Sequence, residues 1–274
     1  MSLYTENEER WKQLSDIDWF TAFTKVWISF NAWYRNHYPD LRTDRKILEE
    51  IKNSHNNFKS KFNSLINGID EKSNYFRDTL GFLQYKLANK EIKHNGIKLS
   101  FEEFVEIDQE QRSREETVRG IKYKIIREIP NLYTKIVKYP LIEIKNSRGQ
   151  EIFKLTNIEI SFSDINEFMR ILEEKLKTYE QFNRLSDNQK SKFISMLNEL
   201  TPFKIINLLE ITDGENYFEC GRFKFRKDEN LLFSALVEIL YSLRNVLFHG
   251  KIIPDKETNE VYEPAYKILK MLVD

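Results

Sequence analysis

The residues best suited to chemistry lie in one apolar stretch near the end of the chain. Residues 229–249 read ENLLFSALVEILYSLRNVLFH, which is apolar on almost every side of a predicted helix. Polar residues at spacings of 4, 4, 3 and 4 interrupt this pattern and line one narrow face: Ser234, Glu238, Ser242, Asn245 and His249. Because an unpaired buried polar group costs about 1–3 kcal/mol, this stripe either pairs within the chain or faces a cleft or a subunit interface.

Three side chains at the end of this helix could transfer a proton and bind a phosphate. His249 can act as base or acid, because imidazole titrates near neutral pH, and the Arg244 guanidinium suits a pair of phosphate oxygens. Asn245 lies one turn before His249 and can orient the ring or the phosphate. On a straight helix Arg244 and His249 point about 140° apart. Two such helices across a twofold axis aim these groups better at one phosphate, so we expect a homodimer.

The stretch Arg244–His249 has the form R-N-x-x-x-H near the end of a hydrophobic helix. It resembles the motif of HEPN domains, the higher eukaryote and prokaryote nucleotide-binding family. The spacing is that of the RNA-cleaving domains of RNA-guided effectors and of many prokaryotic toxins. The stretch with Phe30-Asn31-Ala32 and Tyr34-Arg35 looks like the first core helix of stand-alone members, and HGKIIP…VYEPAYKILKML looks like their closing loop and helix. The resemblance covers about residues 15–40 and 228–273.

This resemblance implies a metal-independent endoribonuclease that needs no cofactor and works as a homodimer. Its catalytic residues are then Arg244, Asn245 and His249. The resemblance also implies a toxin or anti-phage defence effector that cleaves cellular RNA. An antitoxin or another regulatory partner is a further expectation of the same kind.

Two groups of residues are candidates for further contacts with RNA. In a hairpin expected over 214–229, basic residues alternate with phenylalanines, which gives the last strand one basic and one apolar face. With two polar residues of the early helix, the candidate RNA-binding residues are Arg222, Lys224, Arg226, Asn31 and Arg35. The basic run 119–148, with tyrosines interleaved, could follow an RNA backbone or form a solvated face.

Plainer interpretations stand beside the catalytic one. His249 before Gly250 could simply end a helix, because an imidazolium near the last carbonyls gains about 0.3–1 kcal/mol. Arg244 could pair with Glu238 or with an acidic residue of another helix. The aromatic face of residues 19–33 is expected to be core. Three histidines are expected at the surface: His37, His55 and His94. Two functional alternatives stay open: a non-catalytic HEPN-like dimer that binds nucleotide, RNA or a protein partner, and a structural protein in which the motif is coincidence.

Composition excludes several classes of protein. The 274 residues carry 43 Lys and Arg against 43 Asp and Glu, which excludes a polycation that binds nucleic acid through its overall charge. Charged residues at 31% and hydrophobic residues at 41% fit a globular chain. The single cysteine, Cys220, excludes disulfide frameworks and zinc knuckles and favours the cytoplasm. We expect no membrane contact, because no run approaches about 18 apolar residues and residues 1–14 lack a secretory signal.

The elements that position the motif are expected to be mainly α. We predict a HEPN-like helical bundle with a small β-hairpin-containing insertion, in a single domain over 1–274. Core helices fall near 15–90 and 164–273, and the mixed insertion falls near 120–163. Helical spacing and caps predict helices at 17–36, 43–66, 72–89, 99–118, 164–184, 187–199, 203–210, 229–249 and 260–273. The segments LIEIKN, EIFKL and NIEISF predict strands, with a turn at 146–149.

Overall fold

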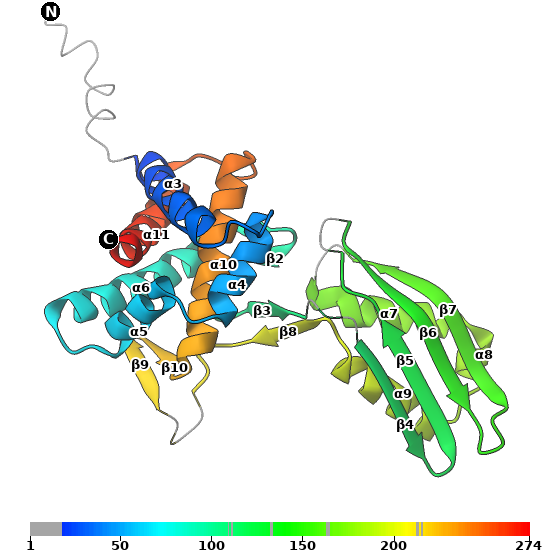
Figure 1. Ribbon diagram of the computed structural model, residues 1–274. Helices are drawn as coiled ribbons and strands as arrows, with labels where there is room; N and C mark the ends of the chain where they lie inside the picture. Colours follow the sequence, from blue (N-terminus) through cyan, green and yellow to red (C-terminus); the bar gives the residue numbers. More distant parts are fainter. Residues whose placement is uncertain are drawn as a thin grey trace, which may run out of the picture. The chain divides into compact units, whose positions relative to one another are not determined.

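The computed structural model describes residues 18–108, 110, 112–131, 134–162, 165–211, 214 and 216–274 (Figure 1). The N-terminal stretch 1–14 and Tyr133 of the basic run lie outside the described residues. The chain divides into two compact units. Unit 1 comprises Met1–His94, Lys98–Phe104 and Asn207–Asp274, and unit 2 comprises Asn95–Ile97 and Val105–Ile206.

The expectation of a mainly helical HEPN bundle is wrong. The fold is mixed α/β, with 51% helix and 23% strand, and the described strands form four antiparallel sheets. Most of the strand content lies in the middle of the chain. There the mixed segment is longer than the predicted insertion 120–163, because unit 2 extends over Val105–Ile206.

Unit 1 is mostly helical. Its helices are α3 (Trp19–His37), α4 (Asp44–Asn53), α5 (Asn57–Asn67), α6 (Glu71–Asn89), α10 (Glu229–Phe248) and α11 (Lys256–Val273). α11 packs along α3 and α6, whereas α4 and α5 pack against α10 (Figure 1). The aromatic face of α3 is core, as predicted, because Phe23, Trp27 and Phe30 are buried.

Side-chain caps decide where these helices begin. The Asp18 carboxylate accepts a hydrogen bond from the third residue of α3, as expected for an N-cap. The single helix predicted over 43–66 is two helices, because Asn56 starts a new one. Its Oδ1 accepts from the Lys59 N–H at 2.9 Å, and its Nδ2 donates to the Ile51 carbonyl at 2.8 Å.

The helix α10 carries the motif through the centre of unit 1. Eleven of its residues are buried. Among the described residues, one helix is long and apolar enough to cross a membrane, and it is α10; 61% of that apolar window is buried inside the protein, and core helices of globular proteins pass the same test. Two short hairpins accompany it: β1 (Lys93–His94) with β2 (Ile97–Lys98), and β9 (Tyr217–Cys220) with β10 (Phe223–Arg226). The second hairpin confirms the prediction over 214–229.

Unit 2 contains an antiparallel sheet in the order β4-β5-β6-β7 with helices packed on it (Figure 1). Its strands are β4 (Arg112–Val118), β5 (Ile121–Arg127), β6 (Ile136–Lys145) and β7 (Glu151–Ser161). The helical segments are the 3-10 helix η1 (Ile165–Glu167), α7 (Phe168–Lys177), α8 (Glu180–Asn183) and α9 (Asp187–Glu199). The turn predicted at 146–149 is confirmed, because Asn146 N–H bonds to the Gln150 carbonyl and Gly149 N–H bonds to the Asn146 carbonyl, both at 2.9 Å.

Two predicted helices are strands in the structure. The predicted helix 99–118 contains β3 (Phe104–Ile107) and most of β4, and β4 pairs with β5. The predicted helix 203–210 begins with β8 (Phe203–Ile206), which pairs with β3. The acidic residues of β4 find cations across the sheet: Glu115 binds Lys122 at 2.6 Å and Lys124 at 3.5 Å. Cross-strand pairing therefore outweighs the helix propensity of these residues, which is a weak local preference.

Candidate functional site

The polar stripe of α10 begins with an internal ion cluster. Glu238 accepts from Arg45 of α4 at 2.7 Å and also binds Lys52 of the same helix. Lys52 lies 2.9 Å from Glu49, which completes the cluster. Burial raises the pKa of Glu238, but the charges of Lys52 and Arg45 outweigh it and hold that pKa below its usual value. This part of the stripe pairs within the chain and anchors α4 on α10.

The next polar residue of the stripe meets a histidine from a distant segment. The Ser242 hydroxyl lies 3.1 Å from Nδ1 of His94, which ends β1. His94, which was predicted at the surface, is partly buried, whereas His37 and His55 are exposed, as predicted. Burial and the charge of Lys251 lower the pKa of His94 to about 4.

Arg244 is held at the side of the stripe by three neighbours. One terminal nitrogen of its guanidinium donates to Asn245 Oδ1 at 2.8 Å, and the other lies 3.8 Å from the Asp44 carboxylate of α4. The guanidinium also stacks over the Phe248 ring, 4.6 Å from its centroid. Arg244 therefore pairs with an acid of another helix, as one interpretation of the sequence held, but that acid is Asp44 and not Glu238.

The end of α3 joins the same network. Arg35 binds Asp44, so one carboxylate is shared between the guanidiniums of Arg35 and Arg244. Asn31 donates from Nδ2 to the Tyr34 hydroxyl. Burial and the nearby Asp44 carboxylate raise the pKa of Tyr34. The structure thus brings Asn31 and Arg35 toward Arg244 and Asn245 through Asp44, a residue the sequence did not single out.

His249 lies just past the last turn of α10 with its side chain exposed. It is the C-cap residue, and its backbone N–H donates to the Asn245 carbonyl. Gly250 follows with a φ of 60°, the left-handed conformation that ends many helices. Two large apolar side chains close to His249 in sequence are exposed: Phe248 at 43% and Ile253 at 74%.

The basic strand β10 is not brought to the motif. Arg226, at its end, directly precedes α10, whereas His249 follows the other end of that helix. A helix of 20 residues is about 30 Å long. Arg222 and Lys224 instead pack on aromatic rings, with centroid distances of 4.0 Å to Tyr85 and 4.4 Å to Tyr217.

The basic run 119–148 is largely paired with acids in unit 2. Lys138 lies 2.6 Å from Glu159 across the sheet, and Lys145 lies 2.8 Å from Glu143. Arg127 is fully buried, where it donates to the Leu200 carbonyl at 2.9 Å. The ion pairs of Lys138 and Lys145 favour the solvated-face interpretation over an RNA track, whereas the buried Arg127 belongs to neither.

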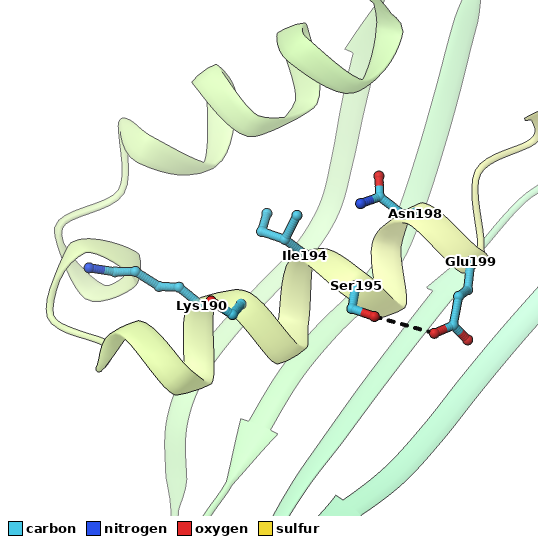
Figure 2. Close-up of a pocket in the computed structure, with 6 residues that line it drawn as sticks. Lys190, Ile194, Ser195, Asn198 and Glu199 are labelled. Atoms are coloured by element: carbon cyan, nitrogen blue, oxygen red, sulfur yellow. Dashed lines mark hydrogen bonds between the residues drawn. The ribbon is translucent and has the colours of Figure 1, made fainter.

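Two surface hollows among the described residues are lined by side chains outside the motif. One lies along a single helix, α9, where Figure 2 shows Lys190, Ile194, Ser195, Asn198 and Glu199 side by side. In this hollow the Ser195 hydroxyl donates a hydrogen bond of 3.4 Å to Glu199 Oε1. Another hollow is lined by residues of α3 and α11. Among the described residues, no three His, Cys, Asp or Glu side chains are grouped so that they could hold a metal ion.

Comparison with protein-family models, with characterised proteins and with solved structures finds no match to this chain. The site is therefore argued from its own geometry. Sequence reasoning missed Asp44, Arg45 and His94, because each reaches α10 from a distant segment. The one local hint was Asn95-Gly96, a dipeptide typical of tight hairpins, which directly follows His94.

Proposed function

We propose that the protein is a metal-independent endoribonuclease whose site lies at the C-terminal end of α10. One observation carries the proposal. The Arg244 side chain is 20% exposed, and its guanidinium has one hydrogen-bond acceptor, Asn245 Oδ1 at 2.8 Å, among the described residues. A guanidinium carries five N–H donors, so this one can take a further acceptor from a ligand. A phosphate oxygen is such an acceptor.

The local charge supports a phosphate as the missing partner. Arg35 and Arg244 share the single carboxylate of Asp44. Two guanidiniums against one carboxylate leave an excess positive charge at this point. Guanidinium groups bind phosphate oxygens in pairs through parallel N–H donors. The phosphodiester of RNA therefore fits this arrangement.

The exposed imidazole of His249 supplies proton transfer. Cleavage by the 2′-hydroxyl needs a group that moves a proton and a charge that stabilises the phosphorane. Arg244 provides that charge, and Asn245 holds the guanidinium through its Oδ1. Neither role needs a metal ion. The products are a 2′,3′-cyclic phosphate and a 5′-hydroxyl.

The active unit in this proposal is a homodimer. On an ideal helix the side chains of Arg244 and His249 leave the axis about 140° apart, and His249 follows the last residue of α10, so we expect one chain to aim the two groups poorly at one phosphate. The exposed apolar pair Phe248 and Ile253 beside His249 offers a surface for the second copy. A cytoplasmic toxin or anti-phage effector acting on cellular RNA is the biological role that the R-N-x-x-x-H motif suggests.

The experiment is cleavage of RNA in excess chelator with analysis of both product ends. We expect undiminished cleavage, cyclic phosphate and 5′-hydroxyl ends, and resistance of RNA that carries one 2′-deoxyribose at the cut. Chelator-sensitive activity that yields 5′-phosphates contradicts the proposal. Wild-type protein that leaves every tested RNA uncut contradicts it as well.

A second candidate is a dimer that binds RNA, nucleotide or a protein partner without cutting. The observation that favours it is the engagement of Arg244 by Asn245, Asp44 and Phe248 within one chain. RNA binding with no cleavage at any pH, weakened by Arg244→Ala, supports this candidate over the enzyme.

A further inference from the structure

We propose, on the basis of the ribonuclease function above, that His94 is the general base of the same active site and that His249 is its general acid. His94 reaches the stripe through a hairpin fixed by its own turn. Asn95 and Gly96 both have positive φ, 55° and 82°, as a two-residue hairpin turn requires. The Leu99 N–H closes the hairpin on the Ile92 carbonyl at 2.9 Å. The imidazole is thus held in place by backbone geometry.

His94 and His249 share one face of α10. His94 contacts Ser242, and Ser242 and His249 are seven residues apart, which is two helical turns with an offset of about 20°. Arg244 points elsewhere, toward Asp44. The two helical turns between Ser242 and His249 span about 10 Å along the helix axis. A phosphodiester along this face therefore meets one imidazole at each side.

The surroundings of His94 keep it neutral at pH 7, the state that a base needs. Burial, Lys251 and, more weakly, His249 and Arg45 lower its pKa, and Glu238 acts against them. In the tautomer that the proposal requires, Nδ1–H of His94 donates to the Ser242 hydroxyl oxygen, and Nε2 keeps the lone pair that accepts a proton. A bound phosphodiester adds a negative charge that raises the pKa toward the range useful for catalysis.

The step balances with these two side chains alone. His94 Nε2 takes the proton of the 2′-hydroxyl, and the 2′-oxygen forms a bond to phosphorus. The bond from phosphorus to the 5′-oxygen breaks, and that oxygen takes a proton from His249. The products are the 2′,3′-cyclic phosphate and the 5′-hydroxyl. Solvent then returns the proton to His249 and removes that of His94.

The test compares His94→Asn, His249→Ala and the matched control His55→Asn in single-turnover cleavage. The asparagine can still bond Ser242 but cannot titrate. We expect His94→Asn to lose about 10²–10⁴-fold in rate, the usual contribution of one acid or base, and to lose the acidic limb of the pH profile. The control, an exposed histidine outside the site, keeps full activity.

A modified substrate separates the base from the acid. When sulfur replaces the 5′-bridging oxygen, the leaving group needs no proton. His249→Ala should then recover, whereas His94→Asn should stay slow. Recovery of His94→Asn on this RNA overturns the assignment. Full activity of His94→Asn on ordinary RNA, with His249→Ala inactive, removes His94 from the mechanism but leaves the ribonuclease function standing. Wild-type protein that leaves RNA uncut overturns both.

A measurement on the wild-type protein covers the case in which His94→Asn does not fold. Imidazole nitrogen NMR is recorded while an RNA with 2′-deoxyribose at the cut is added. We expect the signals of His94 and His249 to shift together and that of His55 to stay. A shift of His249 without one of His94 overturns the proposal.

Discussion

At the residue scale, the site depends on donors that the chain leaves unfilled. Arg244 carries five N–H donors, yet its acceptor within hydrogen-bond distance is Asn245, and Asp44 lies 3.8 Å away. Asp44 keeps Arg35 as a partner when Arg244 is removed. The guanidinium therefore contributes more to ligand binding than to the stability of the fold.

We expect Arg244→Ala and His249→Ala each to abolish RNA cleavage. Helix content and melting temperature should stay near wild type, with a loss in stability below about 1 kcal/mol, because both groups are partly or fully exposed. Arg244→Lys is the matched variant; it keeps the charge but loses the paired donors, so it should stay strongly impaired. Full activity of either alanine variant on RNA that wild type cuts removes that residue from the site.

His94 should also make the protein sensitive to mild acid. Its folded pKa of about 4 lies below the value of about 6.5 in the unfolded chain. Between these values the unfolded chain binds a proton that the folded chain does not, so stability is full above pH 6.5 and falls toward pH 4. As the pH falls through this interval, the free energy of unfolding should decrease for both proteins. We expect the decrease for His94→Asn to be smaller than that for wild type by about 1–2 kcal/mol, because the His94 ring is partly exposed and the effect is screened.

Urea unfolding at steps between pH 7 and pH 4 measures this difference. His55→Asn should follow the wild-type curve, because His55 is exposed. Parallel curves for His94→Asn and wild type show that burial does not hold the His94 ring neutral.

What the sequence could predict at this scale follows from distance along the chain. Ser242, Asn245 and His249 share a face because helical periodicity alone places them there. Asp44 and His94 could not be assigned, because their contacts with α10 arise from packing between segments far apart in sequence. The same limit applies to Arg222 and Lys224, whose positions at the opposite end of α10 depend on where the β9–β10 hairpin packs.

At the element scale, local signals located α10 but predicted helices for residues 99–118 and 203–210, where the structure has strands. α10 combines a cap at Asp228, a long apolar run and Gly250 after its end, and these signals agree. Residues 99–118 are rich in helix-forming acids, yet their cross-strand partners make β4 a strand. The predicted helix 43–66 is divided in two because Asn56 is the N-cap of α5. In the sequence alone, this asparagine looks like any polar residue within a helix.

The packing of α6 on β9 gives a test of the fold of unit 1. Gly81 lies in α6 against the backbone of Cys220, and a Cβ at this position would collide with that carbonyl. Replacement of a helical glycine by alanine ordinarily stabilises a helix by about 1 kcal/mol. Here we expect Gly81→Ala to destabilise unit 1 by about 1–3 kcal/mol, the usual cost of overpacking.

Chemical denaturation of Gly81→Ala provides the measurement. Ala88→Gly, an exposed position on the same helix, is the matched control and should cost about 0.5–1 kcal/mol through propensity alone. A gain in stability for Gly81→Ala shows that α6 and β9 do not approach this closely.

At the scale of the whole molecule, the proposed dimer determines which chain contributes each catalytic side chain to a site. His94 and His249 lie on one face of α10 and belong to one chain. On an ideal helix the side chains of Arg244 and His249 leave the axis about 140° apart, so in the proposed dimer the Arg244 that serves this phosphate comes from the second copy. An interface that holds these groups in register should bury more than about 1,000 Å² in total, and Phe248 and Ile253 are exposed apolar residues close to His249 in sequence.

Mixing inactive variants tests this assignment. In a mixed dimer of Arg244→Ala and His249→Ala, one of the two sites receives an intact Arg244 from one chain and an intact His249 from the other. Random exchange makes half of the dimers mixed, so the mixture should regain about a quarter of wild-type activity. A mixture of His94→Asn and His249→Ala should regain none, because every site then lacks one imidazole. Capture of an untagged variant by an affinity-tagged copy of the other variant confirms that chains exchange. If the mixture of Arg244→Ala and His249→Ala is as inactive as each variant alone, each site is built by a single chain.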